Sequence, residues 1–196
     1  MTVDFTLDEI TESLSDLDLA ILHLLHAGGN SAVRGDVIFQ KELFLIGNCI
    51  ERIGDEADFV PHLFGPYSES AEVALDGLVS LGLVRRSEGG YTLTPEGMSA
   101  WEKVCSAFPP EESEAIDDFK EFLNDLSVDE VLLFVYVTYP EYARESARRR
   151  KILQRRAPLS ASLYRKGKVS LEKAAFLAGM NIESYLDYLR GCPDRV

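Results

Sequence analysis

Nine basic side chains and no acidic one lie between residues 148 and 168. Guanidinium and ammonium groups at this density neutralise phosphates, so such a run is typical of segments that contact nucleic acid. We therefore expect duplex DNA as a partner of this stretch, which we call the basic segment. Its bases are Arg148, Arg149, Arg150, Lys151, Arg155, Arg156, Arg165, Lys166 and Lys168.

The rest of the chain carries the opposite charge. The formal net charge of −13 argues against a general nucleic-acid binder. Residues 1–143, however, contain 28 acids and 7 bases, whereas residues 144–196 contain 5 acids and 13 bases. This asymmetry indicates separate tasks for the two parts of the chain. The alternative is that the basic segment pairs with the acidic part of the same chain or of a partner chain.

Patterns of catalytic or metal-binding residues are weak. His23 and His26 have a spacing that could ligate a metal, but no third ligand follows nearby, and the leucines around them favour a core helix. The chain has no G-x-S-x-G motif, no P-loop and no G-x-G-x-x-G motif. We expect no enzymatic activity, no cofactor and no metal. An enzyme whose site is assembled from distant residues is the remaining alternative.

The location of the protein follows from its cysteines and its apolar runs. Cys49, Cys105 and Cys192 have the spacing of neither a disulfide framework nor a zinc site. The longest apolar run, Val131–Val137, is far shorter than the roughly 20 residues that span a bilayer. The acidic N-terminus lacks the basic and apolar regions of a secretory signal. We expect a cytoplasmic protein with reduced thiols and no membrane contact.

Hydrophobic spacing and helix caps predict the elements of the first half of the chain. Apolar residues at helical spacing predict a first helix that Gly28–Gly29 closes and a second helix over Val37–Ile53. An extended stretch over residues 59–64 ends at the turn Gly65-Pro66, after which Ser68 is placed to cap a third helix.

A β-hairpin and another helix follow. Leu83–Arg86 and Tyr91–Leu93 flank a turn and predict the hairpin. Thr94 followed by Pro95 predicts the start of a helix that ends near Ala107. The order of helix, helix, short strand, helix, hairpin and helix is that of a winged helix.

The third helix of this order is acidic. Ser68–Leu81 contains Glu69, Glu72 and Asp76 and no lysine or arginine, so it is a poor match for DNA. Its surface suits a protein partner or the basic segment. Tyr67 is a further candidate for partner contact, because tyrosine is enriched at interfaces.

The second half of the chain is predicted to be helical. Ser127–Glu130 has the spacing of a capping box in front of an apolar helix, which Tyr139-Pro140 interrupts. Pro158 and Ser160 indicate a turn or linker before the tail. A helix over Ser170–Ala178, a turn at Gly179-Met180 and a second helix from Asn181 fit a helix-turn-helix.

If this helix-turn-helix binds DNA, its second helix should enter the major groove. Asn181 and Ser184 would then contact bases and Arg190 would lie nearby. Glu183 and Asp187 on the same helix oppose this arrangement, because phosphates repel them. The alternative is a helical hairpin that packs against another element or dimerises.

Two stretches carry family resemblances. Phe39–Leu45, Leu63–Ser68 (LFGPYS) and Leu78–Leu83 together resemble the Panacea (SocA-like) antitoxin domain and the related YwgA-like family over about residues 16–107. This resemblance implies a winged-helix-like interaction module without enzymatic activity, as in antitoxins and a protease adaptor. The tail, Lys168–Arg190, resembles the UPF0175-like helix-turn-helix family, with the matching residues between Gly167 and Met180, and this resemblance implies an antitoxin-like or DNA-binding role.

These observations predict a mainly α fold with a small β-hairpin. Residues 1–107 would form a winged-helix-like interaction domain, residues 108–147 a helical middle segment, and residues 148–196 the basic segment with the helix-turn-helix tail. We expect a homodimeric, DNA-binding transcriptional regulator or an antitoxin-like protein. The alternative is a module that binds only protein.

Overall fold

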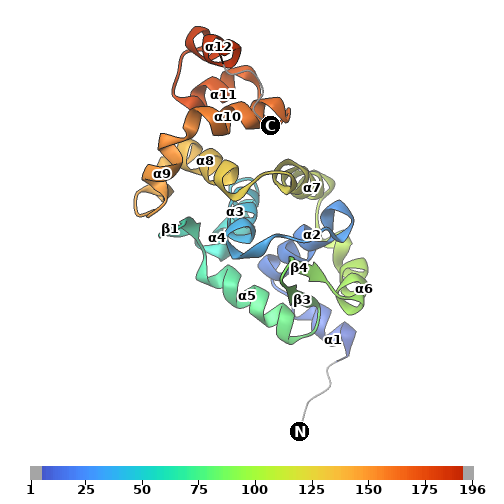
Figure 1. The fold of residues 1–196 in the computed structure, drawn as a ribbon. Helices are drawn as coiled ribbons and strands as arrows, with labels where there is room; N and C mark the ends of the chain where they lie inside the picture. The colour runs from blue at the N-terminus through green and yellow to red at the C-terminus, as the bar shows by residue number, and fades with distance from the viewer. Residues whose placement is uncertain (1–5, 192–196) are drawn as a thin grey trace. The chain divides into compact units, whose positions relative to one another are not determined.

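The computed structural model describes residues 6–191 and confirms a mainly helical fold. Twelve α-helices, two short 3-10 helices and two two-stranded sheets make up the described part of the chain (Figure 1). The chain packs as two compact units. Within the described residues, unit 1 comprises residues 6–60 and 66–124, and unit 2 comprises residues 61–65 and 125–191. The predicted functional division at residues 107 and 147 stays a prediction.

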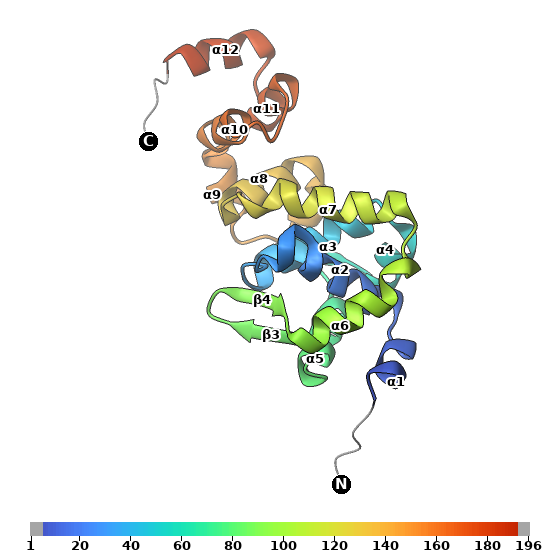
Figure 2. The same cartoon turned by 90° about the vertical axis from the view of Figure 1, so that its right-hand side faces the viewer.

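Unit 1 is built around one buried helix, α2. Leu17, Ala20, Ile21, Leu24 and Leu25 are almost fully buried, because helices and the β4 strand pack around α2. Figure 2 shows α7 running across α2 and α3. The elements of this unit are α1 (Leu7–Glu12), α2 (Asp16–Asn30), α3 (Gly35–Gly47), α4 (Glu51–Ala57), α5 (Glu69–Ser80), β3 (Val84–Ser87), β4 (Gly90–Leu93), α6 (Pro95–Val104), η1 (Cys105–Ala107) and α7 (Pro110–Asn124). The strands β1 (Val60–His62) and β2 (Gly65–Tyr67) pair with each other, and residues 61–65, which include parts of both strands, belong to unit 2.

The predicted second helix is wrong as a single element. Helix α3 ends at Gly47 and α4 begins at Glu51. Asn48 ends α3, where its side-chain Nδ2 donates to the Phe44 carbonyl at 2.7 Å. The two helices then pack so tightly that a Cβ on Gly54 would lie 2.4 Å from the carbonyl oxygen of Gly47. Helical spacing over residues 37–53 cannot distinguish one helix from two that bury the same face.

The predicted hairpin is confirmed. Strands β3 and β4 are antiparallel, with Val84 opposite Leu93 and Ser87 opposite Gly90. Val33 extends this ribbon by exchanging two backbone hydrogen bonds with Tyr91, at 3.0 and 2.9 Å. A Cβ on Gly90 would lie 1.9 Å from the Val33 carbonyl oxygen, so this close approach requires glycine.

The two motifs of the first resemblance meet in the core of unit 1. The Gln40 amide exchanges two hydrogen bonds with the Ser68 backbone, at 2.8 and 3.0 Å, and the Lys41 ammonium donates to the Pro66 carbonyl at 2.7 Å. Burial lowers the pKa of Lys41 to about 7. Ser68 caps α5 by accepting from Ala71 N–H at 2.9 Å, as predicted. The motif residues therefore fix the backbone at the start of α5.

Unit 2 is helical. Its elements are α8 (Val128–Thr138), η2 (Pro140–Ala143), α9 (Arg149–Gln154), α10 (Arg156–Arg165), α11 (Leu171–Ala178) and α12 (Ile182–Gly191), with α10 and α11 side by side (Figure 1). Ser127 and Glu130 form the predicted capping box of α8. The predicted linker at Pro158 and Ser160 is wrong, because both lie inside α10. Pro158 is tolerated there because it occupies the first turn, where the backbone N–H needs no helical partner.

The two helices and the turn that were predicted for the tail are confirmed. Ser170 caps α11, Gly179 turns the chain with φ of 71°, and Asn181 accepts from Ser184 N–H at 2.8 Å at the start of α12. The buried residues of this small core are Ala174, Ala175, Ala178 and Tyr185. Within residues 6–191, no helix has both the length and the apolar character that a bilayer crossing requires.

Candidate nucleic-acid interface

The loop between η2 and α9 is fixed by one buried serine. The Ser146 Oγ donates to the Leu63 carbonyl at 3.1 Å, accepts from Arg148 N–H at 3.2 Å, and lies 2.6 Å from the Tyr136 hydroxyl. Burial raises the pKa of Tyr136, so this hydroxyl stays protonated and can donate. Ala147 N–H donates to the same Leu63 carbonyl at 3.1 Å. The arginines on both sides of Ser146 therefore project from a rigid backbone.

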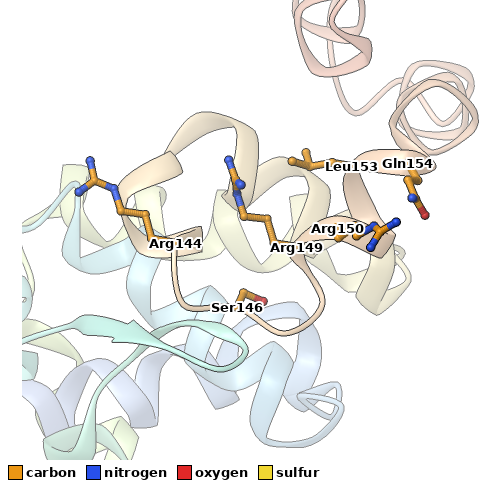
Figure 3. Close-up of a pocket in the computed structure, with 6 residues that line it drawn as sticks. All are labelled: Arg144, Ser146, Arg149, Arg150, Leu153 and Gln154. Atoms are coloured by element: carbon orange, nitrogen blue, oxygen red, sulfur yellow. The ribbon is translucent and has the colours of Figure 1, made fainter.

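Three arginines line a hollow of about 580 Å³ at this loop. Figure 3 shows the side chains of Arg144 and Arg149 extending in the same direction, whereas Arg150 is directed away from them. All three side chains are exposed, and so is Lys151. Among residues 6–191, no carboxylate pairs with any of these four bases. We call these residues, Arg144, Arg149, Arg150 and Lys151, the arginine surface.

Three other predicted bases pair with acids of unit 2. Arg155 forms an ion pair with Asp129, and Lys168 lies 3.5 Å from Asp125. Lys166 donates to the Glu130 carboxylate at 2.9 Å. Burial raises the pKa of Glu130, but hydrogen bonds from Ser162, Lys166 and Ser127 outweigh burial and hold that pKa below its ordinary value. The alternative of internal pairing therefore applies to part of the basic segment.

Two further predicted bases have other surroundings, and a third is exposed. The Arg156 guanidinium donates to the carbonyls of Leu177 at 2.8 Å and Phe176 at 3.1 Å, so it caps the end of α11. Arg148 is half-buried, and its positive charge partly offsets the rise that burial causes in the pKa of Tyr136. Arg165 is exposed at the end of α10.

The predicted groove-contacting residues lie on α12 and at its start. Asn181 is committed to capping, with its Oδ1 accepting from Ser184 N–H. Arg190 forms an ion pair with Asp187 at 3.0 Å. Because Glu183 is also exposed, the surface of α12 is not positive. Among the described residues, the structure does not place Asn181, Ser184 and Arg190 beside unpaired basic side chains that would favour phosphate binding.

The predicted partner-binding acids share one face of α5. Glu69, Glu72 and Asp76 are exposed at helical spacing. Glu72 accepts a hydrogen bond from the Tyr67 hydroxyl, which raises the pKa of Tyr67 to about 12. Asp76 pairs with Arg86 at 2.8 Å. Two of the three acids are thus already engaged within unit 1.

Arg144 was not among the predicted DNA-contacting residues. The predicted segment began at Arg148 because Glu145 interrupts the basic run. A wider window gives the missing signal, since residues 144–156 contain seven bases and one acid. Pro140 is the second signal, because the turn that follows it brings Arg144 beside α9.

Unit 1 also contains buried ionisable groups. Glu42 and Lys120 are each 1% exposed, and the Glu42 Oε2 and the Lys120 Nζ are without hydrogen-bond partners among the described residues. Burial raises the pKa of Glu42 to about 7, and Lys120 and Arg34 partly offset this effect. His23 packs against Trp101 and lies 3.5 Å from Asp117.

The described residues do not assemble a metal site. Within residues 6–191, no group of three or more His, Cys, Asp and Glu side chains is placed to hold a metal ion. Comparison of the chain with models of known families, with curated proteins and with solved structures finds no match.

Proposed function

We propose that this protein is a non-enzymatic regulator that binds the phosphate backbone of duplex DNA through the arginine surface. The observation that carries this proposal is the hollow lined by Arg144, Arg149 and Arg150, whose guanidinium groups lack acidic partners among the described residues. Guanidinium groups donate to phosphate oxygens in a planar fork, and unpaired ones bind without first breaking an internal ion pair.

Rigidity supports the same proposal. Ser146 ties the loop to Tyr136 and Leu63, so the backbone between Arg144 and Arg149 loses little conformational entropy when a ligand binds. Four phosphate contacts would give a slope of about −3.6 in a plot of log affinity against log salt concentration. Between 50 and 200 mM salt, the affinity would fall about 150-fold.

The proposal places DNA contact on α9 and its preceding loop. Backbone contacts of this kind position a protein on DNA without specifying a sequence. The helix α12 contributes little to phosphate binding in this account, because Glu183 and Asp187 accompany Arg190 along it.

We assign unit 1 the role of a winged-helix-like interaction domain, in line with the resemblance to the Panacea (SocA-like) antitoxin family. The order α2, α3, α4, β1–β2, α5, β3–β4 and α6, with the antiparallel hairpin β3–β4, supports this assignment. Through this domain the protein would form a homodimer or bind a partner in the cytoplasm.

A second candidate function is that of an antitoxin-like or adaptor module that binds only protein. One observation favours it: Val73 is 66% exposed on α5, at helical spacing from Glu69 and Asp76. An exposed apolar residue among acids suits a partner with a basic rim. This candidate predicts that binding to a partner survives loss of the arginine surface.

Titration of fluorescently labelled duplex DNA with the full-length protein at 50 mM salt tests the proposal. The wild type should raise the fluorescence anisotropy, and Arg144→Gln/Arg149→Gln/Arg150→Gln should weaken binding at least tenfold. Glu88→Gln, an exposed substitution in the β3–β4 turn, should leave the affinity within twofold. Absence of binding by the wild type at this salt concentration would overturn the proposal and favour the protein-only module.

A further inference from the structure

A second hollow in unit 2 differs in character from the arginine surface. It has a volume of about 520 Å³ and lies where α11 turns into α12. Its apolar part includes Phe176, Met180 and Ile182, and its acidic part includes Glu172 and Glu183. We call this hollow the tail groove.

Two apolar residues of the tail groove, Phe176 and Ile182, are not part of the core that holds the tail together. That core consists of alanines and Tyr185, with Met180 among the partly buried residues packed against it. Phe176 and Ile182, by contrast, are 55% and 43% exposed. Lys173 lies over the Phe176 ring, with its Nζ 5.2 Å from the ring centroid, while the same Nζ contacts Thr138 Oγ1 at 3.0 Å.

The acids of the tail groove, Glu172 and Glu183, have no basic partner within the described residues. Hydrogen bonds from its own backbone N–H and from the Ser170 hydroxyl lower the pKa of Glu172. Glu183 is exposed in the first turn of α12. The basic residue of the last turn of α12, Arg190, pairs with Asp187. The tail groove therefore has an apolar part and a negative rim.

This charge pattern decides between classes of occupant. A phosphate backbone is disfavoured, because Glu172 and Glu183 would repel it. A second copy bound about a two-fold axis is also disfavoured, because an isologous contact would place two acidic rims against each other. A segment with apolar side chains flanked by lysine or arginine complements both the exposed apolar side chains and the negative rim.

We propose that the tail groove binds a basic amphipathic peptide segment of another protein, with its apolar side chains on Phe176 and Ile182 and its cationic side chains on Glu172 and Glu183. This interaction is separate from DNA binding by the arginine surface, so either activity can fail without the other. The tail would then bind a protein segment, although the basic sequence that precedes it suggests DNA binding.

The test uses the full-length protein and a labelled 18-residue peptide of leucine and lysine at helical spacing. A peptide with glutamate in place of lysine is the first control. Wild-type protein should bind the lysine peptide and not the glutamate peptide. Phe176→Ser/Ile182→Ser should raise the Kd at least tenfold. Val60→Ser, at a comparably exposed apolar position of β1 in unit 1, should leave it within twofold.

A charge-matched comparison removes the effect of the net charge of −13, which attracts any cationic peptide. Glu172→Gln/Glu183→Gln should weaken binding at least fivefold more than Glu88→Gln/Glu102→Gln, two exposed glutamates of unit 1. Because all substituted side chains are exposed, these variants should keep the circular-dichroism spectrum of the wild type. Equal affinities in the two pairs, or in Phe176→Ser/Ile182→Ser and wild type, would overturn the proposal.

Sedimentation velocity tests whether a second copy of the chain occupies the tail groove. The oligomeric state should be the same for wild type and Phe176→Ser/Ile182→Ser. A wild-type dimer that this double substitution dissociates would show that a second copy covers the tail groove, and it would also overturn the proposal.

Discussion

The Nε of Arg156 donates a hydrogen bond to the carbonyl oxygen of Leu177 at 2.8 Å. This bond joins the first residue of α10 to the last turn of α11, where carbonyl groups lack helical partners. One of the nine bases of the basic segment is therefore a structural residue, and substitution separates this role from phosphate binding.

Arg156→Ala should lower the free energy of unfolding by about 1–3 kcal/mol, because it leaves carbonyls at the end of α11 without their charged donor. Arg149→Ala should change it by less than about 0.5 kcal/mol, because this side chain is exposed and contacts no acid among the described residues. Urea unfolding followed by circular dichroism measures both. Equal stabilities of the two variants would contradict the capping role of Arg156.

Gly179→Ala should destabilise the protein more than Gly167→Ala does. Both glycines have positive φ, 71° and 69°, so both substitutions carry the backbone cost of about 1 kcal/mol. Only at Gly179 would the new Cβ meet another group, the Arg156 Cζ at 2.4 Å. The excess cost at Gly179 should shrink when Arg156 is also alanine, in a double-mutant cycle of unfolding free energies. An excess that persists without Arg156 would show that the contact is not its cause.

Ser68→Ala should cost about 2 kcal/mol of unfolding free energy. The Ser68 Oγ is buried, accepts from Ala71 N–H, and donates to the Ala57 carbonyl. Ser80→Ala, at an exposed position of the same helix, is the matched control and should stay within about 0.5 kcal/mol of wild type. Thermal or urea unfolding distinguishes them, and a neutral Ser68→Ala would refute the account of the start of α5.

Glu42→Gln should change how stability depends on pH. The pKa of Glu42 is raised to about 7 in the folded protein, above its ordinary value of 4.5. The folded state therefore binds more protons than the unfolded state between these values, and the wild type loses stability relative to Glu42→Gln as pH rises from about 4.5 to 7. The loss should amount to about 3 kcal/mol. Urea unfolding of wild type and Glu42→Gln at several pH values measures it. A difference between the two that does not change with pH would contradict the raised pKa.

Local signals predicted most of the elements. Capping residues such as Ser68, Thr94 and Ser127 predicted where helices begin. The side chain of such a residue accepts a hydrogen bond from the backbone N–H three residues later, so the start of the helix depends only on neighbouring residues. The break between α3 and α4 was not predicted, because it depends on the packing of Gly54 against Gly47. Pro158 was wrongly placed in a linker, because a proline in the first turn of a helix resembles a helix breaker.

The candidate site could be predicted only in part. Charge along the sequence located the basic segment, but pairing in space divides it. Arg155 pairs with Asp129, which is 26 residues away in the sequence. Lys166 pairs with Glu130, which is 36 residues away. Arg144 joins Arg149 because the chain turns after Pro140. Contacts of this range are tertiary, so composition alone cannot separate a paired base from an unpaired one.

The central claim is that the arginine surface contacts DNA phosphates, and the salt dependence of duplex binding tests it most directly. The account predicts that Arg144→Gln/Arg149→Gln changes the slope of log affinity against log salt from about −3.6 to about −1.8. The charge-matched pair Arg85→Gln/Arg190→Gln, on the β3–β4 hairpin and α12, should keep the wild-type slope. An unchanged slope in the first pair, or an equal reduction in both pairs, would contradict the claim.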